Sequence, residues 1–413
     1  MKPVATVRTT CRLCHGTPLE LALSMRPTPI ADAYVSAEQA GQSQESYPLD
    51  LFLCRSCGHV QLVTVIDPKI LFCNYRYTTS TSAGLADHFR QSCDDILKRF
   101  PQATGGLIVD IGSNDGTYLR FFQQRGFQVL GVDPALEISN KATTEGIETI
   151  SQFFTRNLSG QIKCGRQTAS IITANNVFAH ADDLEDIVAG IRELLSPSGI
   201  FVFEVAYLPD LIQKNLFDTI YHEHLSYHSV KPLKRFFHRL GLQLIAAQRI
   251  PSKSGSLRAF VQRSDGQYTE EASVEQLIAY EDNLGLERLE TYQTIHHAIQ
   301  RLRIKIHDIM RSMTAQGSKI AGYGASATVT TLLYQMELEG TISFLVDDNS
   351  ARHGLFSPGC HLPILAPSAL YEQKPSLVIV LAWPYSKQIV SKHHQFLSQG
   401  GHIVLPLPDL EVL

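Results

Sequence analysis

The segment Leu107-Ile-Val-Asp-Ile-Gly-Ser-Asn-Asp-Gly-Thr117, followed by Leu130-Gly-Val-Asp-Pro134, decides the fold of this chain. The first stretch is an apolar, β-branched run that enters a glycine-containing turn, after which a helical pattern begins. The second stretch is another apolar run, and it ends in an acid, Asp133, which lies 21 residues past Gly112. A strand, a turn, a helix and a second strand ending in an acid form the unit that holds a nucleoside, with the acid on the ribose hydroxyls.

The turn favours S-adenosylmethionine (SAM) over NAD as the bound nucleoside. Asn114 stands where a G-x-G-x-x-G turn has its second glycine, which lets the backbone approach a pyrophosphate. A sulfonium amino acid needs no such approach, and its positive charge favours nearby acids. We therefore expect SAM here, although an ordinary turn of an α/β domain has a similar pattern. The predicted cofactor contacts in these two stretches are Asp110, Gly112, Ser113, Asn114, Asp115 and Asp133.

Length and charge restrict the classes of protein to consider. A chain of 413 residues is too long for one core, so we expect two or three domains. A net charge of −4 and scattered Lys and Arg argue against a nucleic-acid-binding surface. No apolar run approaches the ~20 residues that span a bilayer, and the N-terminal residues lack the apolar core of a signal peptide. We predict a cytoplasmic monomer or weak homo-oligomer with no nucleic-acid or membrane partner.

Two C-x-x-C pairs predict a metal site near the N-terminus. Cys11-Arg-Leu-Cys14 and Cys54-Arg-Ser-Cys57 each offer two thiolates, and four thiolates complete a tetrahedral zinc site with no open position. Such a closed site stabilises a small domain and carries out no chemistry. A thioredoxin-type redox role is the competing interpretation, but neither pair begins a helix inside a βαβ pattern. The remaining cysteines are isolated, and we expect small core residues at Cys73, Cys93, Cys164 and Cys360.

The pattern along the chain divides it into three predicted parts of the α/β class. Residues 1–78 form the zinc module, in which the 39 residues between the two cysteine pairs predict an excursion from a compact ribbon. Residues 79–270 alternate strands and helices, as in a doubly wound, Rossmann-like sheet with short loops. Residues 271–413 begin with a long charged helical stretch and continue into a second Rossmann-like domain. Besides the two opening stretches, the strands expected in the middle part are Ala169–Ala174 and Ile200–Val205, with a helix at Leu184–Leu195.

The last part carries a second glycine-containing turn, Gly322-Tyr-Gly-Ala-Ser-Ala327. It follows a predicted strand, precedes a predicted helix, and has the acid Asp347 25 residues after Gly322. By itself this is a better dinucleotide fingerprint than the turn at Gly112. Three interpretations stay open at this point: the fold holds NAD, holds a nucleotide-linked substrate, or holds nothing.

Titratable side chains are concentrated in Phe217-Asp-Thr-Ile-Tyr-His-Glu-His-Leu-Ser-Tyr-His-Ser229. Histidine titrates near neutral pH, and burial tunes Tyr and Glu, so such groups gather where protons are moved. Solvated or core histidines are the first alternative. A metal site is the second, although His222-Glu-His224 lacks the H-E-x-x-H spacing that places both histidines on one helical face.

Weaker candidates surround these motifs. Asn175, Asn176 and His180 follow a strand where a SAM-binding fold lines the cofactor, but a polar loop beside a helix cap has the same composition. Phe153 is a candidate for stacking on adenine and is equally plausible as a core aromatic residue.

Two further segments are candidates for substrate contacts. Arg76 and Tyr77 lie in a segment whose aromatic and hydroxyl groups suit a sugar. Arg258 is a candidate for pairing with a phosphate, although a salt bridge is the commoner fate of such a residue.

Together the motifs resemble those of the bacterial nucleotide-sugar C-methyltransferases, which make branched deoxysugars. The resemblance covers nearly the whole chain and rests on four motifs in order. They are the paired C-x-x-C module ending in Cys54-Arg-Ser-Cys-Gly-His-Val-Gln61, the turn Val109-Asp-Ile-Gly-Ser-Asn-Asp-Gly116, the loop Tyr221-His-Glu-His224 and the turn Gly322-Tyr-Gly-Ala325. Where the family often has a His-Gly-Gly-Ser-type run, this chain has Lys253-Ser-Gly-Ser256, which indicates different substrate contacts there.

The resemblance implies a reaction and roles for particular residues. The substrate would be a 4-keto-6-deoxyhexose linked to thymidine, guanosine or cytidine diphosphate, methylated at C3 by SAM. His224 would remove the C3 proton, Tyr221 would help to stabilise the enolate or shuttle protons there, and Glu223 would stand beside this acid/base pair. The last domain would help to bind the substrate nucleotide without a cofactor, which makes Tyr323, Gly324, Ala325 and Asp347 candidate substrate contacts together with Tyr77 and Arg258.

Two other functions remain to be weighed against this one. An NAD-dependent oxidoreductase would use the turn at Gly322, but no catalytic Tyr-x-x-x-Lys pair follows that turn. A non-catalytic zinc-ribbon scaffold would have no need for the dense His, Tyr and Glu loop.

Overall fold

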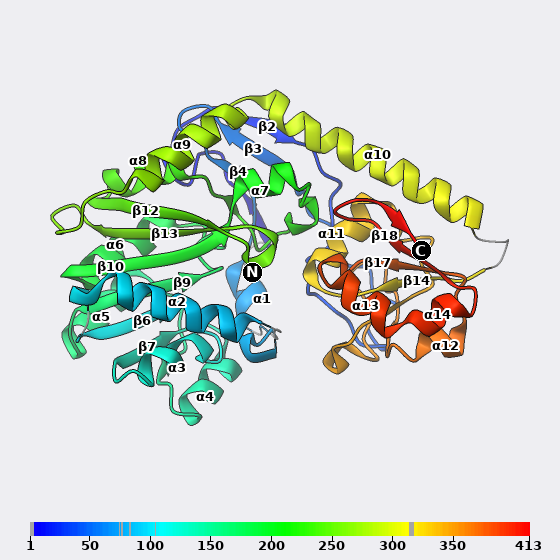
Figure 1. Cartoon of the computed structure of the whole chain (residues 1–413), viewed down its shortest axis with the longest axis horizontal. Coiled ribbons are helices and arrows are strands. Elements are labelled where there is room, and N and C mark those ends of the chain that lie inside the picture. The colour runs from blue at the N-terminus through cyan, green and yellow to red at the C-terminus, as the bar shows by residue number, and fades with distance from the viewer. Residues whose placement is uncertain (1–3, 74, 76, 82–83, 104, 314–317) are drawn as a thin grey trace. The chain divides into compact units, whose positions relative to one another are not determined.

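The computed structural model describes residues 4–73, 75, 77–81, 84–103, 105–313 and 318–413 (Figure 1). These residues group into two compact units that are each discontinuous in sequence. Unit 1 comprises Met1–Glu20, Leu53–Pro209 and Leu225–Glu287, and unit 2 comprises Leu21–Phe52, Asp210–His224 and Arg288–Leu413. Most of the segment between the two cysteine pairs, Leu21–Phe52, thus belongs to unit 2. This agrees with the predicted excursion of that segment from a compact ribbon. The domain boundaries expected at residues 78 and 270 stay a prediction.

Unit 1 is built on a seven-stranded sheet in the order β12-β13-β10-β9-β6-β7-β8. All neighbouring strands are parallel except β13, which runs antiparallel to both β10 and β12. This order confirms the predicted doubly wound sheet. The strands are β6 (Leu107–Ile111), β7 (Gln128–Val132), β8 (Thr149–Ile150), β9 (Ala169–Asn175), β10 (Leu195–Ala206), β12 (Leu242–Ile250) and β13 (Ser256–Arg263).

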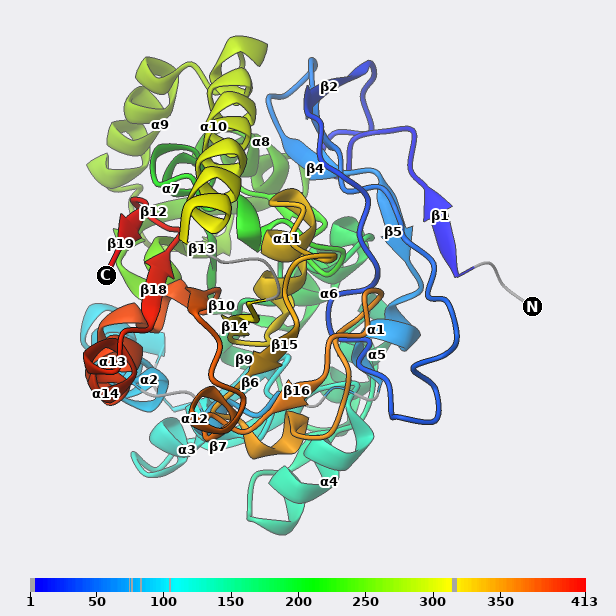
Figure 2. The same ribbon diagram turned by 90° about the vertical axis from the view of Figure 1, so that its right-hand side faces the viewer.

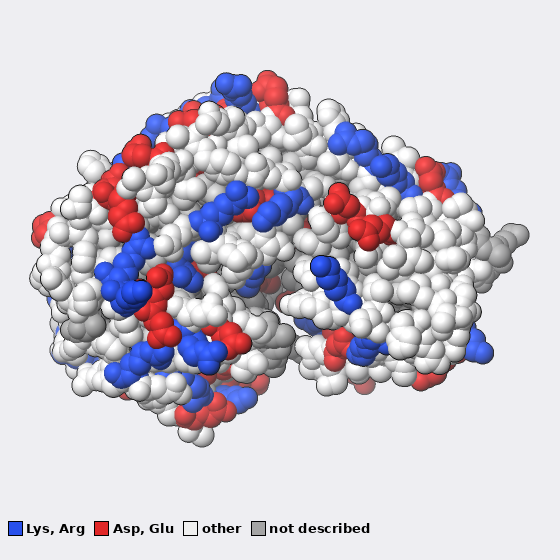
Figure 3. Space-filling view, viewed as in Figure 1, with Lys and Arg blue, Asp and Glu red and all other residues white. Residues whose placement is uncertain are grey.

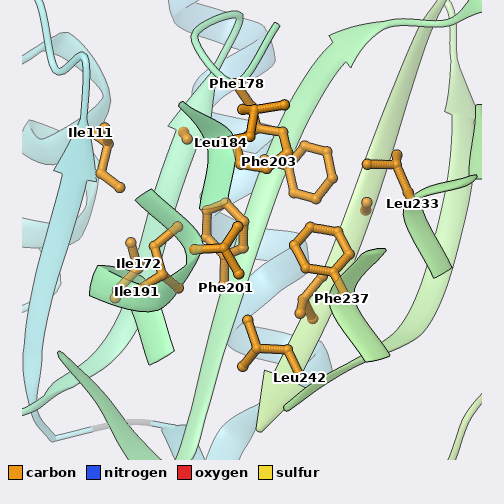
Figure 4. Packing of buried hydrophobic residues seen from close by; sticks show 14 of the residues in the cluster. Ile111, Ile172, Phe178, Leu184, Ile191, Phe201, Phe203, Leu233, Phe237 and Leu242 are labelled. Atoms are coloured by element: carbon orange, nitrogen blue, oxygen red, sulfur yellow. The ribbon is translucent and has the colours of Figure 1, made fainter. Parts of the chain in front are cut away.

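Helices cover both faces of this sheet because its strands are apolar on both sides. Phe201 and Phe203 face one hydrophobic cluster, and the alternate residues Ile200 and Val202 face another. Figure 4 shows the first cluster, in which Phe178 and Phe237 pack beside Phe203. Helices α5 (Arg156–Gly165), α6 (Leu184–Leu194), α8 (Val230–Arg239) and α9 (Ala272–Leu284) contribute to that cluster, and α2 (Leu85–Arg99) and α3 (Thr117–Gln123) contribute to the other. Helix α4 (Leu136–Thr144) contacts β8, and the short helix α7 (Leu208–Gln213) follows β10 in the chain.

The N-terminal strands form two small sheets. One has four strands in the order β11-β4-β3-β2, and the other pairs β1 with β5. In the ladder between β11 and β4, Tyr227 stands opposite Val60. The elements are β1 (Ala5–Val7), β2 (Leu19–Leu23), β3 (Leu51–Cys54), β4 (Val60–Leu62), β5 (Thr64–Ile66), α1 (Pro68–Phe72) and β11 (Ser226–Tyr227).

Unit 2 contains a second sheet, in the order β16-β15-β14-β17-β18-β19, which is parallel except for β19. Figure 2 labels β14, β15, β16, β18 and β19 of this sheet together with the helix α11. The second Rossmann-like domain is thereby confirmed. Its elements are β14 (Ile320–Tyr323), α11 (Ala327–Gln335), β15 (Phe344–Val346), β16 (Ile364–Leu365), α12 (Ala369–Gln373), β17 (Leu377–Val380), α13 (Ser386–Lys392), α14 (His394–Ser398), β18 (His402–Leu405) and β19 (Glu411–Val412).

The long charged helical stretch expected at the start of residues 271–413 is divided into two helices. Helix α9 ends at Gly285, whose φ of 69° is the left-handed conformation of a helix C-terminus, and α10 (Leu289–Met313) follows. One side of α10 buries residues three or four positions apart, from Tyr292 to Met310. None of the helices among the described residues is long and apolar enough to cross a membrane. On the face shown in Figure 3, acidic and basic side chains are interspersed.

Candidate functional site

The turn after β6 has a conformation that its glycines make possible. Gly112 has a φ of 69°, and a Cβ atom there would lie 2.3 Å from Val177 Cγ2. Gly116 has a φ of 75° and lies against Ile147 in the same way. Between them Asn114 adopts a φ of 50°, which Asn tolerates better than most residues. The turn is therefore a fixed, left-handed structure at the carboxyl edge of the sheet, directly before α3.

Asp133 lies beside this turn, at the end of β7. Its Oδ2 accepts a hydrogen bond of 2.9 Å from the Asn114 amide, and its Oδ1 accepts one of 2.9 Å from the Ala135 amide. Burial raises the pKa of Asp133, which is 8% exposed. Each carboxylate oxygen has a second lone pair, so the fixed carboxylate retains the acceptors that ribose hydroxyls need.

Asp110 lies deeper in the sheet, on β6. It is 3% exposed and accepts a hydrogen bond of 2.6 Å from Thr173 Oγ1 on the neighbouring strand β9. Burial raises the pKa of Asp110 to about 7; the Thr173 bond opposes this rise, and the charge of Asp133 adds to it. The side chain is thus oriented within the protein, and its predicted contact with the cofactor stays a prediction.

The side chains of Asn114 and Asp115 hold residues 77–80, which we call the strap. Asn114 Nδ2 donates to the Tyr77 carbonyl at 2.9 Å, and Asn114 Oδ1 accepts from the Thr79 amide at 2.8 Å. Asp115 Oδ2 accepts from the Ser80 amide at 2.9 Å. The strap thereby brings Tyr77 to the turn. Arg76, which we expected near the sugar, lies outside the described residues.

Two buried polar atoms near the turn fit a bound ligand. Ser113 Oγ and Asn175 Nδ2 have no hydrogen-bond partner among the described residues. Buried polar atoms are nearly always paired, so a ligand or water is the expected partner. The residues present at this edge therefore fit SAM, which would supply partners for both.

The other predicted contacts at this edge differ in their surroundings. Asn176 has a φ of 55° and donates its amide to the Glu204 carbonyl at 2.7 Å. His180 stacks on Phe72, with ring centroids 5.5 Å apart and planes 7° apart. Phe153 is half-buried. The roles predicted for these three residues in cofactor binding stay predictions.

A buried ion cluster on β10 and β13 was not predicted. Glu204 Oε2 lies 2.7 Å from His88 Nε2, and Glu204 Oε1 lies 2.6 Å from Arg258 Nε. Burial alone would raise the pKa of Glu204, but the bond from His88 and the charge of Arg258 outweigh it, so the pKa is lowered. Arg258 also lies 3.4 Å from Asp95, so two carboxylates already face the guanidinium that we expected on a phosphate. The one signal for this cluster in the sequence was an acid, Glu204, near the end of the otherwise apolar run Ile200–Val205.

The four cysteines of the two C-x-x-C pairs converge in unit 1. The Sγ atoms of Cys11 and Cys57 are 3.6 Å apart, as are those of Cys14 and Cys54, and all four lie within 4.8 Å of one another. Thiolates at the vertices of a tetrahedral zinc site are about 3.8 Å apart, given Zn–S bonds of about 2.3 Å. The donor set therefore fits zinc and leaves no position for a substrate.

The remaining cysteines differ in exposure. Cys93 is fully buried on α2, as predicted. The prediction of a core residue is wrong for Cys164, which is exposed because it lies on the outer side of α5. Cys73 and Cys360 are half-buried.

The loop of residues 217–224 lies in unit 2 and brings Tyr221 and His224 together. Their ring centroids are 4.1 Å apart, and the His224 amide donates to the Tyr221 carbonyl at 2.9 Å. His224 Nδ1 lies 2.7 Å from the Thr219 carbonyl oxygen, which can only accept, so Nδ1 carries the proton. In the neutral ring Nε2 then holds the lone pair, which is the tautomer that a base needs.

The other titratable residues of this loop are more deeply buried. His222 is 1% exposed, donates from Nε2 to the Tyr47 carbonyl at 3.3 Å, and has a pKa that burial lowers to about 4. Glu223 is 4% exposed. A neutral, buried His222 is a structural residue of the loop and not a proton carrier near neutral pH.

The turn at Gly322 is occupied by the protein's own groups. The Ala325 amide donates to Asp347 Oδ2 at 2.7 Å, and the Ala325 carbonyl accepts from the Tyr34 hydroxyl. Gly324 has a φ of 111°, and a Cβ atom there would lie 2.7 Å from the Cβ of Ala382. The second glycine of the fingerprint is thus required by close approach of Ala382.

Tyr323 and Asp347 make further contacts inside unit 2. The Tyr323 hydroxyl donates to Asp348 Oδ2 at 3.0 Å and lies 3.1 Å from His393 Nε2. Asp347 Oδ2 also lies 3.2 Å from Arg352 Nη1. The structure therefore brings Ala325 and Asp347 together, and their contact with a substrate stays a prediction.

Sequence models of three families match consecutive parts of the chain. A "Putative zinc binding domain" matches residues 11–72, a "Methyltransferase domain" matches residues 85–247, and a "C-methyltransferase C-terminal domain" matches residues 251–408. The C-methyltransferase NovU of Streptomyces niveus is 32% identical over 405 residues, which are 98% of this chain and 96% of NovU.

Solved structures match less than half of the chain. A SAM-dependent methyltransferase from Clostridium acetobutylicum is 12% identical, with a TM-score of 0.36, over 42% of this chain and 92% of that protein. Magnesium protoporphyrin IX methyltransferase from Synechocystis, with bound SAM, is 13% identical, with a TM-score of 0.33, over 44% of this chain and 81% of that protein.

Proposed function

This chain belongs to the family of SAM-dependent C-methyltransferases with a zinc-binding domain, and from that premise we propose that it methylates C3 of a nucleotide-linked 4-keto-6-deoxyhexose. The observation that carries the proposal is the state of His224. Its Nδ1–H is fixed on the Thr219 carbonyl at 2.7 Å, and its ring lies 4.1 Å from that of Tyr221. A base and a hydroxyl donor side by side are the two groups that enolate formation requires.

The chemistry follows from the weakness of carbon as a nucleophile. A sugar carbon becomes nucleophilic only when a neighbouring ketone lets its proton leave. His224 Nε2 takes the C3 proton, and the electrons of that C–H bond pass into the enolate, whose oxygen accepts a hydrogen bond from Tyr221. When bound, SAM supplies an electrophilic methyl group. This methyl group would pass from sulfur to the enolate carbon, and the electron pair of the C–S bond would stay on sulfur. His224 then releases its proton to solvent.

The residues of unit 1 would hold the cofactor. Asp133 would accept hydrogen bonds from the ribose hydroxyls, because both of its oxygens are already oriented by backbone amides. Ser113 Oγ and Asn175 Nδ2 would find their partners in the same ligand. The cysteine cluster would hold zinc in a structural role, since four thiolates leave no coordination position open.

The substrate nucleotide belongs to the second Rossmann-like domain in this proposal. Tyr323, Gly324, Ala325 and Asp347 lie at the carboxyl edge of its sheet, where open α/β sheets bind ligands. The Asp347 carboxylate accepts from the Ala325 amide, as the Asp133 carboxylate accepts from the Asn114 amide in unit 1, and it is oriented at this edge in the same way. Thymidine, guanosine and cytidine diphosphates are the candidate carriers, and the free cysteines support a cytoplasmic location.

Binding calorimetry on the zinc-loaded protein tests the ligands first. We expect SAM and one of the three nucleoside diphosphates to bind independently and NAD not to bind. Binding of NAD without SAM would refute the proposal in favour of an oxidoreductase.

Turnover of the keto sugar then tests the two proton-handling residues. His224→Ala should abolish methyl transfer and Tyr221→Phe should reduce it about 10²-fold or more, with SAM affinity unchanged in both variants. His297→Ala, which removes an exposed imidazole from α10, is the matched control. Full activity in His224→Ala would show that the base is a different residue. Failure of the native protein to turn over any keto sugar would favour a scaffold.

A further inference from the structure

We propose that Trp383 and Asp218 are positioning residues for His224, and that they hold the loop of residues 217–224 in the geometry of proton transfer. The inference rests on the proposed function, because it takes His224 as the base. It depends on contacts within unit 2 alone.

The contact between Trp383 and Asp218 is short and buried. Trp383 Nε1 donates to Asp218 Oδ2 at 2.7 Å, and the two residues are 8% and 2% exposed. Asp218 Oδ1 has no hydrogen-bond partner among the described residues, so the indole is the carboxyl's one side-chain partner there. Burial raises the pKa of Asp218 to about 6, and the indole bond opposes this rise. Backbone groups of Asp218 and Thr219 also lower its pKa, but a carboxyl buried to this degree still costs stability, which points to a requirement for the geometry that it imposes.

Asp218 is connected to His224 through Thr219, the next residue in the chain. Thr219 provides the carbonyl that accepts from His224 Nδ1 at 2.7 Å. On the other side of Thr219, the Ile220 carbonyl accepts from Thr331 Oγ1 of α11 at 2.8 Å. Thr219 is therefore held between two buried anchors, one at Asp218 and one at Ile220. Because its carbonyl sets both the tautomer and the orientation of the imidazole, a shift of this peptide would move the base.

The glycine turn of unit 2 determines the position of Trp383. Trp383 follows β17, and the preceding residue, Ala382, donates its amide to the Tyr323 carbonyl at 2.8 Å. Only a glycine at position 324 lets Ala382 approach so closely, since a Cβ atom there would lie 2.7 Å from that of Ala382. The glycine turn that resembles a dinucleotide fingerprint thus fixes the position of Trp383. Through the bond from Trp383 to Asp218, it also helps to fix the loop of residues 217–224.

The test measures proton removal separately from methyl transfer. In D2O without SAM, an enzyme with a working base exchanges the hydrogen next to the ketone of the substrate, and NMR follows that exchange. Trp383→Phe keeps the aromatic packing and removes the N–H. We expect it to lower both the exchange rate and kcat about 10- to 100-fold while the KM for SAM stays within about twofold. Tyr385→Phe, on an exposed residue two positions away, should change neither rate.

A conservative pair at position 218 adds a rescue experiment. Asp218→Asn keeps an oxygen that accepts from the indole, whereas Asp218→Leu keeps the branching at Cγ and removes every acceptor. We expect the Asn variant to exchange about tenfold faster than the Leu variant. Thr331→Val removes only the hydroxyl at the second anchor, and we expect a loss of about fivefold in kcat. This variant is a milder test if Trp383→Phe does not fold.

The outcomes separate the inference from the proposed function. Loss of exchange in His224→Ala, together with the losses above in folded variants, supports both. Loss of exchange in His224→Ala with native rates in Trp383→Phe and Thr331→Val would overturn the positioning role and leave the base in place. Native exchange in His224→Ala would overturn the proposed function and the inference together. Lower melting temperatures with native rates per folded molecule would assign the contact to stability alone.

Discussion

Replacing Asn114 should release the strap without unfolding the protein. The Asn114 side chain makes two hydrogen bonds to the strap, at 2.9 Å to the Tyr77 carbonyl and at 2.8 Å from the Thr79 amide. At about 1 kcal/mol for each bond, Asn114→Gly should lower the free energy of local opening by about 2 kcal/mol. Since 1.4 kcal/mol is about a factor of ten, the Thr79 amide should exchange with deuterium about 30-fold faster.

A second substitution at the same position separates the bonds from the backbone. Asn114 has a φ of 50°, which Gly adopts at no steric cost and Ala does not. Asn114→Ala should therefore lose about 1 kcal/mol more than Asn114→Gly in global stability, measured by urea unfolding. The Gly112 amide, which donates to the Val132 carbonyl at 2.7 Å, is the internal control and should keep its protection. Unchanged exchange at Thr79 in Asn114→Gly would refute the reasoning, because the strap would then be held by other groups.

Three further predictions concern zinc, the second turn and pH. Cys54→Ser should abolish stoichiometric zinc, measured by mass spectrometry of the metal, and lower the melting temperature, whereas substitution of the exposed Cys164 should do neither. Gly324→Ala should cost about 2–4 kcal/mol in urea unfolding, because its Cβ would lie 2.7 Å from that of Ala382 at a φ of 111°; Gly340→Ala, with nothing within 4 Å, should cost little. The pKa of Asp110 is about 7 in the folded protein against an ordinary 3.8, so between these values the folded state holds a proton that the unfolded state has released. Stability should therefore fall as pH rises through this window, by up to about 4 kcal/mol, and Asp110→Asn should lose that part of the slope in urea unfolding at pH 5 and pH 7.5. An identical slope in the variant would show that another group carries the proton.

The sequence predicted those parts of the protein that depend on local patterns. The strand, turn and acid from Leu107 to Asp133 needed only β-branched runs, two glycines and their spacing, and the structure has them at these positions. The cysteine pairs were equally local, because each C-x-x-C defines half of the metal site. Periodicity and motif spacing act within about 30 residues, which is the range over which a single sequence is informative.

Contacts between segments that are distant in sequence could not be predicted from such local patterns. Trp383 and Asp218 are 165 positions apart, and nothing in either local pattern indicates that they meet. Arg258 shows the same limit, since its local surroundings suggested a phosphate or a salt bridge and gave no sign of Glu204, 54 positions earlier. The turn at Gly322 was interpreted from its motif alone. The residue whose close approach requires a glycine at position 324 is Ala382, which lies after β17 and far from the turn in sequence. Tertiary contacts decide such residues, and only the fold supplies them.

The interleaving of the two units determines when each of them is completed during synthesis. The chain passes from one unit to the other after Glu20, Phe52, Pro209, His224 and Glu287. The last segment of unit 1 is therefore translated after two segments of unit 2, and unit 2 closes only with the final strand of the chain. A nascent chain that has released Cys57 has all four thiolates available, so the zinc site can form before the seven-stranded sheet of unit 1 or the six-stranded sheet of unit 2 has been synthesised. No single truncation point yields either unit free of segments of the other, and a zinc site that forms early would hold residues 21–52 at both ends until the rest of unit 2 has been synthesised.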